Sequence, residues 1–259
     1  MKDWIEPLEA IARRAGEEIM AVYAQDFEVM AKDDASPLTQ ADLAAHRCIV
    51  SQLPALDGGL PILSEESAAI AWPERRAWSR YWLVDPLDGT REFVKKNGEF
   101  TVNIALIEDG RPVLGVVYAP ALDWLLLGGS GLGAFWRQGG ARGEARVAAA
   151  PETLRVAASR SHRDETTQAY LDRIGAVDTV GLGSSLKFCK IATGEIDLYP
   201  RFGPTSEWDT AAAQAVLEGA GGGVFTLDGQ PLRYNGKDSL LNPHFIAVGD
   251  RGIAWRDWL

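Results

Sequence analysis

Residues 81–90 are the part of this sequence that most restricts its fold and chemistry. Four apolar residues, 81–84, precede the sequence Asp85-Pro86-Leu87-Asp88-Gly89-Thr90. An apolar run that proline and glycine bring to an end predicts a buried strand leading into a turn. The turn carries two carboxylates and a hydroxyl, which together with the Leu87 carbonyl are the oxygen ligands that hard divalent cations prefer. The segment therefore predicts a metal site at a strand end.

Length and charge narrow the class of protein. The chain has 259 residues, of which 46% are hydrophobic, enough for one large domain or two closely packed parts. The net charge is −10 and no Lys/Arg cluster provides the basic face that a nucleic-acid polymer requires. The acidic net charge is still compatible with a small anionic substrate, because bound metals and a few cationic side chains can reverse the local electrostatic field.

The sequence also indicates a compartment. Its two cysteines, Cys48 and Cys189, do not form a disulfide framework. Lys2 is followed at once by acidic residues, which is not typical of a signal peptide. No apolar run approaches the ~20 residues of a membrane span. We expect a cytoplasmic protein, a monomer or a homodimer, with peripheral contact to the inner membrane left open.

Periodicity predicts helices and then strands in the first part of the chain. Apolar residues recur at helical spacing over residues 3–24, and a second helix is expected to begin at Thr39, with Asp42 in its first turn. Short apolar runs predict strands at 61–64, 81–84, 100–107, 112–118, 124–127 and 134–137. The sequence Glu108-Asp109-Gly110-Arg111 predicts a hairpin turn between two of them.

The second part alternates between the two kinds of element. Strands are expected at 154–159, 177–181, 197–200, 223–226 and 245–248, and helices at 164–174, 184–193 and 209–219. This arrangement is typical of a layered α+β protein rather than a regular doubly wound fold. We expect an N-terminal α+β part, 1–150, and a C-terminal α/β part, 151–259, that form one compact catalytic unit.

Carboxylates stand at the ends of several expected elements. Glu65 follows one strand, Asp85 and Asp88 follow another, and Asp209 opens a helix. Four such charges repel one another unless cations neutralise them, and two magnesium ions would balance them. Each acid also has an ordinary explanation: Asp209 as an N-cap, Asp88 as a turn residue and Glu65 as part of a solvated surface pair. Their conjunction favours the metal site.

Longer motifs resemble the signatures of the inositol monophosphatase superfamily. Residues 85–93 (DPLDGTREF) are similar to its first signature, and residues 208–212 (WDTAA), leading into 218–222 (EGAGG), are similar to its second. Residues 63–66 (LSEE) and 39–42 (TQAD) match two more motifs in the right order. The resemblance covers nearly the whole chain. It implies an inositol-monophosphatase-like layered αβαβα sandwich and a magnesium-dependent phosphatase.

The resemblance also implies a set of metal ligands. Glu65, Asp85 and the Leu87 carbonyl would hold a first magnesium ion, and Asp85, Asp88 and Asp209 a second, so that Asp85 bridges the two. Paired metals of this kind clamp the attacking and leaving oxygens of an in-line displacement. A third, weaker ion near Glu65 is implied as well.

Catalysis would then proceed through water. By the resemblance, Thr90 and Glu65 orient the attacking water, and Asp42 is hydrogen-bonded to Thr90. If a helix starts at Thr90, the backbone amides of Gly89 and Thr90 point at the phosphate, and Gly89, without a Cβ, lets it approach. No covalent phosphoenzyme is required.

Five further stretches resemble the bacterial bisphosphate nucleotidases within the superfamily: 97–106, 115–120, 159–162, 183–189 and 199–205. Such enzymes belong to sulfur metabolism and remove the 3'-phosphate of adenosine 3',5'-bisphosphate, giving AMP. Lys187 and Arg201 are candidates for the second phosphate. Ser184 would share a helical face with Lys187. His162 could touch ribose or phosphate, the alternative being a surface-loop histidine.

The predicted substrate contacts are Asp88, Gly89, Thr90, His162, Ser184, Lys187, Arg201 and Asp209. One alternative function is another phosphomonoesterase of the superfamily, acting on an inositol, fructose or histidinol phosphate. A second is a non-catalytic, metal-binding regulatory protein that has kept the fold. The second is disfavoured because all the implied ligands and catalytic residues are present.

Overall fold

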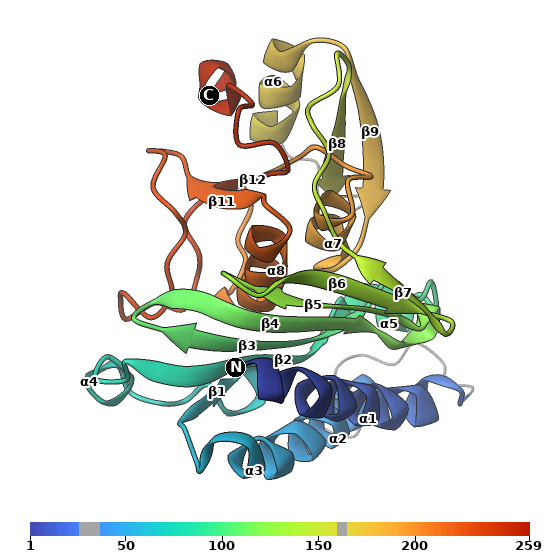
Figure 1. Cartoon of the computed structure of the whole chain (residues 1–259), viewed down its shortest axis with the longest axis vertical. Coiled ribbons are helices and arrows are strands. Elements are labelled where there is room, and N and C mark those ends of the chain that lie inside the picture. Colours follow the sequence, from blue (N-terminus) through green and yellow to red (C-terminus); the bar gives the residue numbers. More distant parts are fainter. Residues whose placement is uncertain (26–36, 160–164) are drawn as a thin grey trace.

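The chain forms five stacked layers of helices and sheets. The computed structural model describes residues 1–25, 37–159 and 165–259. Figure 1 shows α1 and α2 covering one face of a sheet, α7 and α8 between that sheet and a second one, and α6 on the far side. This is the αβαβα sandwich that the sequence predicts.

The first helical layer contains α1 (Ile5–Tyr23), preceded by a 3₁₀ turn (Lys2–Trp4), together with α2 (Pro37–Gln52) and α3 (Pro54–Asp57). Helix α1 buries one face, because its apolar residues recur every three or four positions. The expected start of the second helix was wrong: α2 begins at Pro37, whose ring fixes the backbone angle required at a first helical position. Asp42 consequently lies in the second turn, not the first.

The first sheet has seven strands in sequence order. They are β1 (Ile62–Ser64), β2 (Arg80–Asp88), β3 (Thr101–Glu108), β4 (Arg111–Ala119), β5 (Trp124–Gly129), β6 (Gly133–Gln138) and β7 (Ala141–Glu144). Strand β1 runs parallel to β2, and all later neighbours are antiparallel. Four short helices lie along its connections: η2 (Glu65–Ser67), α4 (Trp72–Arg75), α5 (Thr90–Val94) and η3 (Pro120–Leu122).

Side chains of β3 alternate between the two faces of this sheet. Val102 and Ile104 pack in the cluster beneath α1 and α2, whereas Ala105 and Ile107 belong to the cluster that contains α7 and α8. Since the side-chain period of a strand is two, Thr101 and Asn103 share the face of Ala105. Two polar residues therefore face the helices between the sheets.

The second sheet has the order β11-β12-β10-β8-β9. Its strands are β8 (Leu154–Ser159), β9 (Val177–Leu182), β10 (Leu198–Arg201), β11 (Gly223–Thr226) and β12 (Phe245–Val248). The helices of this part are α6 (Glu165–Ile174), α7 (Leu186–Ala192), α8 (Glu207–Gly219) and η4 (Trp255–Trp258).

Two expected helix starts in this part were wrong. The helix expected at 184–193 begins only at Leu186, because Ser184 has a φ of 51°, a left-handed conformation outside the helical region. The helix expected to open at Asp209 begins at Glu207, with Ser206 as its N-cap. Asp209 is therefore the third residue of α8.

Helix α8 lies directly against the first sheet, and this contact fixes the position of Asp209. A Cβ added to Gly115 on β4 would lie 2.3 Å from the carbonyl oxygen of Ala212, so glycine is required for the close approach. One apolar cluster also contains residues from both sheets, such as Leu83 and Tyr199. None of the helices in the described ranges has the length and apolar character of a membrane span.

Candidate active site

Strand β2 carries the first two carboxylates of the site. Asp85 pairs with Asn103 of β3, and the register shifts between Asp85 and Asp88, which marks a bulge. The strand thus continues through residues expected to form a turn, a correction to the predicted strand end at residue 84. Gly89, with a φ of 91°, then caps α5 (Thr90–Val94), so a helix does start at Thr90, the condition set for phosphate binding by the backbone amides of Gly89 and Thr90.

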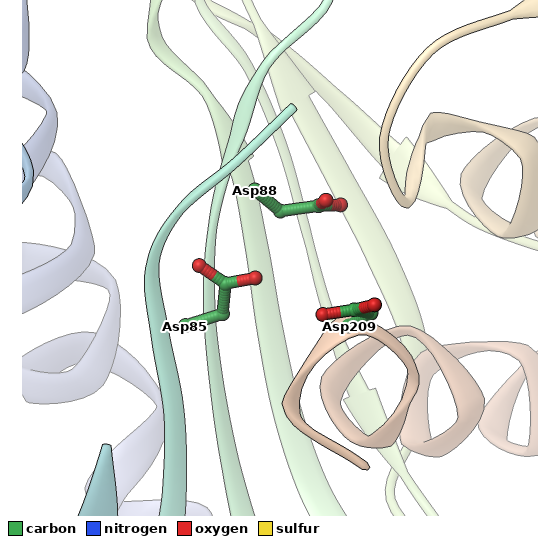
Figure 2. Close-up of side chains that lie close together, drawn as sticks. All are labelled: Asp85, Asp88 and Asp209. Carbon is green, nitrogen blue, oxygen red and sulfur yellow. The ribbon is translucent and has the colours of Figure 1, made fainter. Parts of the chain in front are cut away.

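Three carboxylates converge between the two sheets. One oxygen each of Asp85, Asp88 and Asp209 lies within 4.8 Å of the others. Figure 2 shows the side chains from β2 and the side chain from α8 pointing toward one another. Residues separated by more than a hundred positions are therefore brought to one small volume.

Backbone groups hold two of these carboxylates in place. Asp85, of which 1% is exposed, accepts a 3.0 Å hydrogen bond at Oδ1 from the Leu87 N–H across the bulge. Asp209 accepts a 2.9 Å hydrogen bond at Oδ2 from the N–H of Ser206, half of a capping box. One oxygen of each carboxylate is fixed, which orients the group toward the shared volume.

Side-chain and backbone donors from the second part of the chain hold the third carboxylate. Asp88 Oδ2 accepts a 2.5 Å hydrogen bond from the Ser184 hydroxyl and a 2.7 Å bond from the Ser185 N–H. Both donors belong to the loop between β9 and α7. Asp88 thus joins the end of β2 to this loop by polar contacts.

The electrostatics of the cluster suit divalent cations. Burial raises the pKa of Asp85 well above its usual range, and the charges of Asp88 and Glu65 add to the effect. Burial and the charge of Asp88 raise the pKa of Asp209 to about 8. Carboxylates crowded in this way ionise together when cations neutralise them, and oxygen ligands are those that magnesium prefers.

Glu65 lies beside this cluster without belonging to it. The parallel register aligns Ser64 with Val84, so Glu65 follows at the level of Asp85. Its charge contributes to the raised pKa of both Asp85 and Asp209. It is not a member of the 4.8 Å group, so its role as a ligand stays a prediction.

The remaining predicted catalytic residues surround the same strand end. Asp42 is buried on α2, which packs against β2 and α5, and its charge also raises the pKa of Asp85. Thr90 is half-buried as the first residue of α5. The hydrogen bond between Asp42 and Thr90 stays a prediction.

A cleft of about 670 Å³ opens from the carboxylate cluster. Seven of the eight predicted substrate contacts line it: Asp88, Gly89, Thr90, Ser184, Lys187, Arg201 and Asp209. The eighth, His162, lies outside the described residues. The cleft is lined by the carboxylates of Asp88 and Asp209 and by two cationic side chains, Lys187 from α7 and Arg201 from β10.

The two cations are positioned by backbone carbonyls. Lys187 Nζ, in a side chain that is 6% exposed, donates to the carbonyls of Leu182 and Ser184 at 3.1 and 2.7 Å. Burial lowers the pKa of Lys187 to about 8. Arg201 Nη2 donates to the Pro204 carbonyl at 2.9 Å.

Sequence reasoning missed three residues that support the site. Thr101, Asn103 and Ser185 form a buried hydrogen-bonded cluster beside Asp88. Polar residues at alternate positions of an otherwise apolar strand were the available signal for Thr101 and Asn103. The contact with Ser185 depends on the fold and has no such signal.

Comparison with known proteins identifies the class. The model of the inositol monophosphatase family matches residues 1–251, and the chain belongs to this family. A protein named 3'(2'),5'-bisphosphate nucleotidase CysQ, from Salmonella typhimurium, is 50% identical over 243 residues, which is 93% of this chain and 98% of that protein.

Solved structures agree with the family and the fold. CysQ from Bacteroides thetaiotaomicron, a bacterial member of the family, superimposes with a TM-score of 0.85 at 41% identity, over 93% of this chain and 95% of that one. An inositol monophosphatase from Zymomonas mobilis gives a TM-score of 0.78 at 27% identity, over 96% and 94% of the two chains.

Proposed function

We propose that the chain is a magnesium-dependent 3'(2'),5'-bisphosphate nucleotidase that removes the 3'-phosphate of adenosine 3',5'-bisphosphate, giving AMP and phosphate. The observation that carries the proposal is 50% identity to a nucleotidase over 93% of the chain. The cleft supports it, because carboxylates and cationic side chains line the same space. Its physiological setting would be sulfur metabolism.

The carboxylate cluster would hold the metal ions. Asp85, Asp88 and Asp209 would be ligands, since one oxygen of each lies within 4.8 Å of the others. Glu65 and the Leu87 carbonyl complete the proposed set, and a third ion would bind near Glu65. Magnesium, when bound, supplies positive charge to the phosphoryl oxygens and lowers the pKa of water.

The protein residues would position the reactants. Thr90 and Glu65 orient the attacking water, and Asp42 accepts a hydrogen bond from Thr90 so that the Thr90 oxygen can take the water proton. The water gives its proton to Thr90 as Thr90 gives its own to Asp42. The water oxygen forms a bond to phosphorus as the bond from phosphorus to the 3'-oxygen breaks, and the 3'-oxygen takes a proton from solvent water. The amides of Gly89 and Thr90 bind the transferred phosphate.

The far wall of the cleft would select a substrate with a second phosphate. Lys187 and Arg201 offer a point charge and a planar fork, the two ways in which proteins bind phosphate. A monophosphate has no second phosphate to pair with these two cations, so it gains less binding free energy from the site than a bisphosphate does. The two parts of the chain, 1–150 and 151–259, thus act as one catalytic unit.

An inositol or sugar monophosphatase of the same family is the alternative activity. The Zymomonas inositol monophosphatase shares only 27% identity, whereas the Salmonella nucleotidase shares 50%. The cationic wall also favours the nucleotide. A non-catalytic regulatory protein is disfavoured because Asp85, Asp88 and Asp209 are all present and converge.

Product analysis tests the proposed activity. Purified protein is incubated with adenosine 3',5'-bisphosphate in magnesium or in EDTA, and the nucleoside monophosphate is separated by chromatography. We expect AMP with magnesium and no turnover with EDTA. Release of adenosine 3'-phosphate would contradict the assignment of the 3'-phosphate, and turnover in EDTA would contradict the metal requirement.

A further inference from the structure

Ser184 has a contact that the proposed function does not use. Its hydroxyl lies 2.5 Å from Asp88 Oδ2 and 2.6 Å from the hydroxyl of Thr101. Its backbone has a φ of 51°, an uncommon conformation for a residue other than glycine. This conformation persists where the surroundings require it.

The surroundings of Ser184 hold it against Asp88 from several sides. Lys187 Nζ donates to the Ser184 carbonyl, and the N–H of Gly183 donates to Glu99 Oε2 at 2.8 Å. A Cβ on Gly89 would lie 3.2 Å from the Cβ of Ser184 and 2.9 Å from the carbonyl oxygen of Glu99. The loop is therefore fixed in a narrow space.

Counting protons gives the network a direction. An ionised carboxylate only accepts hydrogen bonds, so the single hydroxyl proton of Ser184 goes to Asp88. Thr101 then donates in its 2.6 Å contact with Ser184, in preference to its 3.2 Å contact with Asn103 Oδ1, to which Ser185 donates at 2.9 Å. Ser185 lies 2.8 Å from Thr101 Oγ1 and, together with Asn103, confines that hydroxyl. Protons thus point from Thr101 through Ser184 to Asp88.

Burial separates Thr101 and Asn103 from the cleft, which Ser184 and Ser185 line. Thr101 has no exposed surface, and Asn103 and Ser185 are 1% and 2% exposed. Thr101 therefore cannot touch a molecule in the cleft. Any effect of its hydroxyl on catalysis has to pass through Ser184 and Asp88.

We infer that Ser184 and Thr101 are positioning residues for the metal site: their hydroxyls orient Asp88 as a metal ligand. The inference rests on the proposed role of Asp88 as a ligand. Donors that hold a metal ligand in place typically change metal affinity by 10–100-fold when they are removed. Ser184 and Thr101 would thus link the second part of the chain to the metal ions bound at the first.

Magnesium binding without substrate tests the inference. The rise in melting temperature is followed as magnesium is added to the wild type and to Ser184→Ala, Ser184→Gly and Thr101→Val. We expect each variant to need ~10-fold more magnesium for half of the rise. Thr101→Ser keeps the hydroxyl and should behave as the wild type. Thr167→Val, a buried threonine on α6, is the matched control and should show no change.

The two substitutions at Ser184 separate the hydroxyl from the backbone. Glycine adopts a positive φ without strain and alanine does not, so equal losses identify the hydroxyl as the cause. A loss with alanine alone would overturn the inference. A raised KM for the nucleotide with an unchanged magnesium requirement would also overturn it, because Ser184 would then be a substrate contact.

Asp88→Asn distinguishes failure of the inference from failure of the function on which it rests. If this variant loses magnesium binding while Ser184→Ala and Thr101→Val keep it, the inference alone is wrong. If Asp88→Asn binds magnesium as the wild type does, the ligand assignment falls and the inference with it. Loss in all three variants supports both.

Discussion

The end of β2 and the residues between β9 and α8 form the two sides of one cleft, but they are built differently. The first side is part of a sheet: Asp85 is buried in a strand paired on both edges, and a bulge turns Asp88 toward the same space. The second side consists of short elements joined by loops: Lys187 lies on α7 and Arg201 ends β10, and both donate to backbone carbonyls.

This difference in construction matches a difference in proposed role: the β2 side holds the metal ions, and the opposite side selects the substrate. A paired strand holds carboxylates with the precision that metal ligation requires, whereas the loops that supply the Ser184 and Pro204 carbonyls to the two cations tolerate change more readily. Asp209 and Ser184 are exceptions to this separation. Both come from the second part of the chain, but Asp209 belongs to the carboxylate cluster and Ser184 donates a hydrogen bond to Asp88. The account therefore predicts different phenotypes for substitutions on the two sides.

The largest effect is expected on the strand side. Asp85→Asn removes a proposed metal ligand, and losing several kcal/mol of charge stabilisation should lower kcat/KM by about 10³-fold or more. In EDTA the same variant should gain melting temperature relative to the wild type as pH rises through the raised pKa of Asp85, because ionisation of this buried carboxyl destabilises only the wild type. Phosphate release and thermal melting measure the two effects. An active Asp85→Asn enzyme would refute the metal site.

A smaller effect, confined to substrate binding, is expected on the side of the cleft that carries Lys187 and Arg201. Arg201→Met removes a charged donor to the second phosphate, worth ~1.5–3 kcal/mol, so KM for the bisphosphate should rise ~10–100-fold. Hydrolysis of inositol 1-phosphate should change little. Arg201→Lys retains the charge but not the planar fork, so its KM for the bisphosphate should lie between those of the wild type and Arg201→Met. Equal losses with both substrates would show that Arg201 is structural.

The pH dependence of KM should report Lys187. Its pKa is about 8 because burial disfavours the ammonium, so the charge is present below that pH and is lost above it. Between pH 7 and 8.5 the protonated fraction falls, and KM for the bisphosphate should rise about fourfold. Lys187→Arg should flatten the profile, since arginine remains charged. A profile unchanged in Lys187→Arg would assign the effect to another group.

The smallest expected effect is on stability without metal. Asp209 has a pKa of about 8 in the folded protein, above its unfolded value, so its contribution is present at low pH and lost as pH rises toward 8. In EDTA the melting temperature should therefore fall by a few degrees between pH 5 and 8. Magnesium should remove most of this fall, and Asp209→Asn should reduce it. A fall of the same size with and without magnesium would contradict the prediction.

Sequence patterns predicted the elements best where apolar runs end at turn residues. Strands β8, β11 and β12 have the expected bounds. Strand β2 was predicted too short, because Pro86 and two carboxylates are typical of a turn, whereas a bulge accommodates them within the strand. The start of α7 was placed too early, since contacts with Asp88 hold Ser184 out of the helix.

The candidate site was predictable to the extent that its residues lie in motifs. Asp85, Asp88 and Asp209 were identified from the sequence, and the fold brings them within 4.8 Å. The supporting role of Thr101 and Ser185 was not identified from the sequence, because a hydroxyl residue within a strand or at a helix start can have many different partners. Their relation to Asp88 appears only when residues about a hundred positions apart are brought together by the two sheets.

The ratio of kcat/KM for adenosine 3',5'-bisphosphate to that for inositol 1-phosphate, measured in magnesium, tests the central claim most directly. A carboxylate end joined to a cationic wall predicts a strong preference for the bisphosphate, and Arg201→Met should reduce that preference ~10–100-fold. Equal rates for the two substrates, or faster hydrolysis of inositol 1-phosphate, would contradict the account.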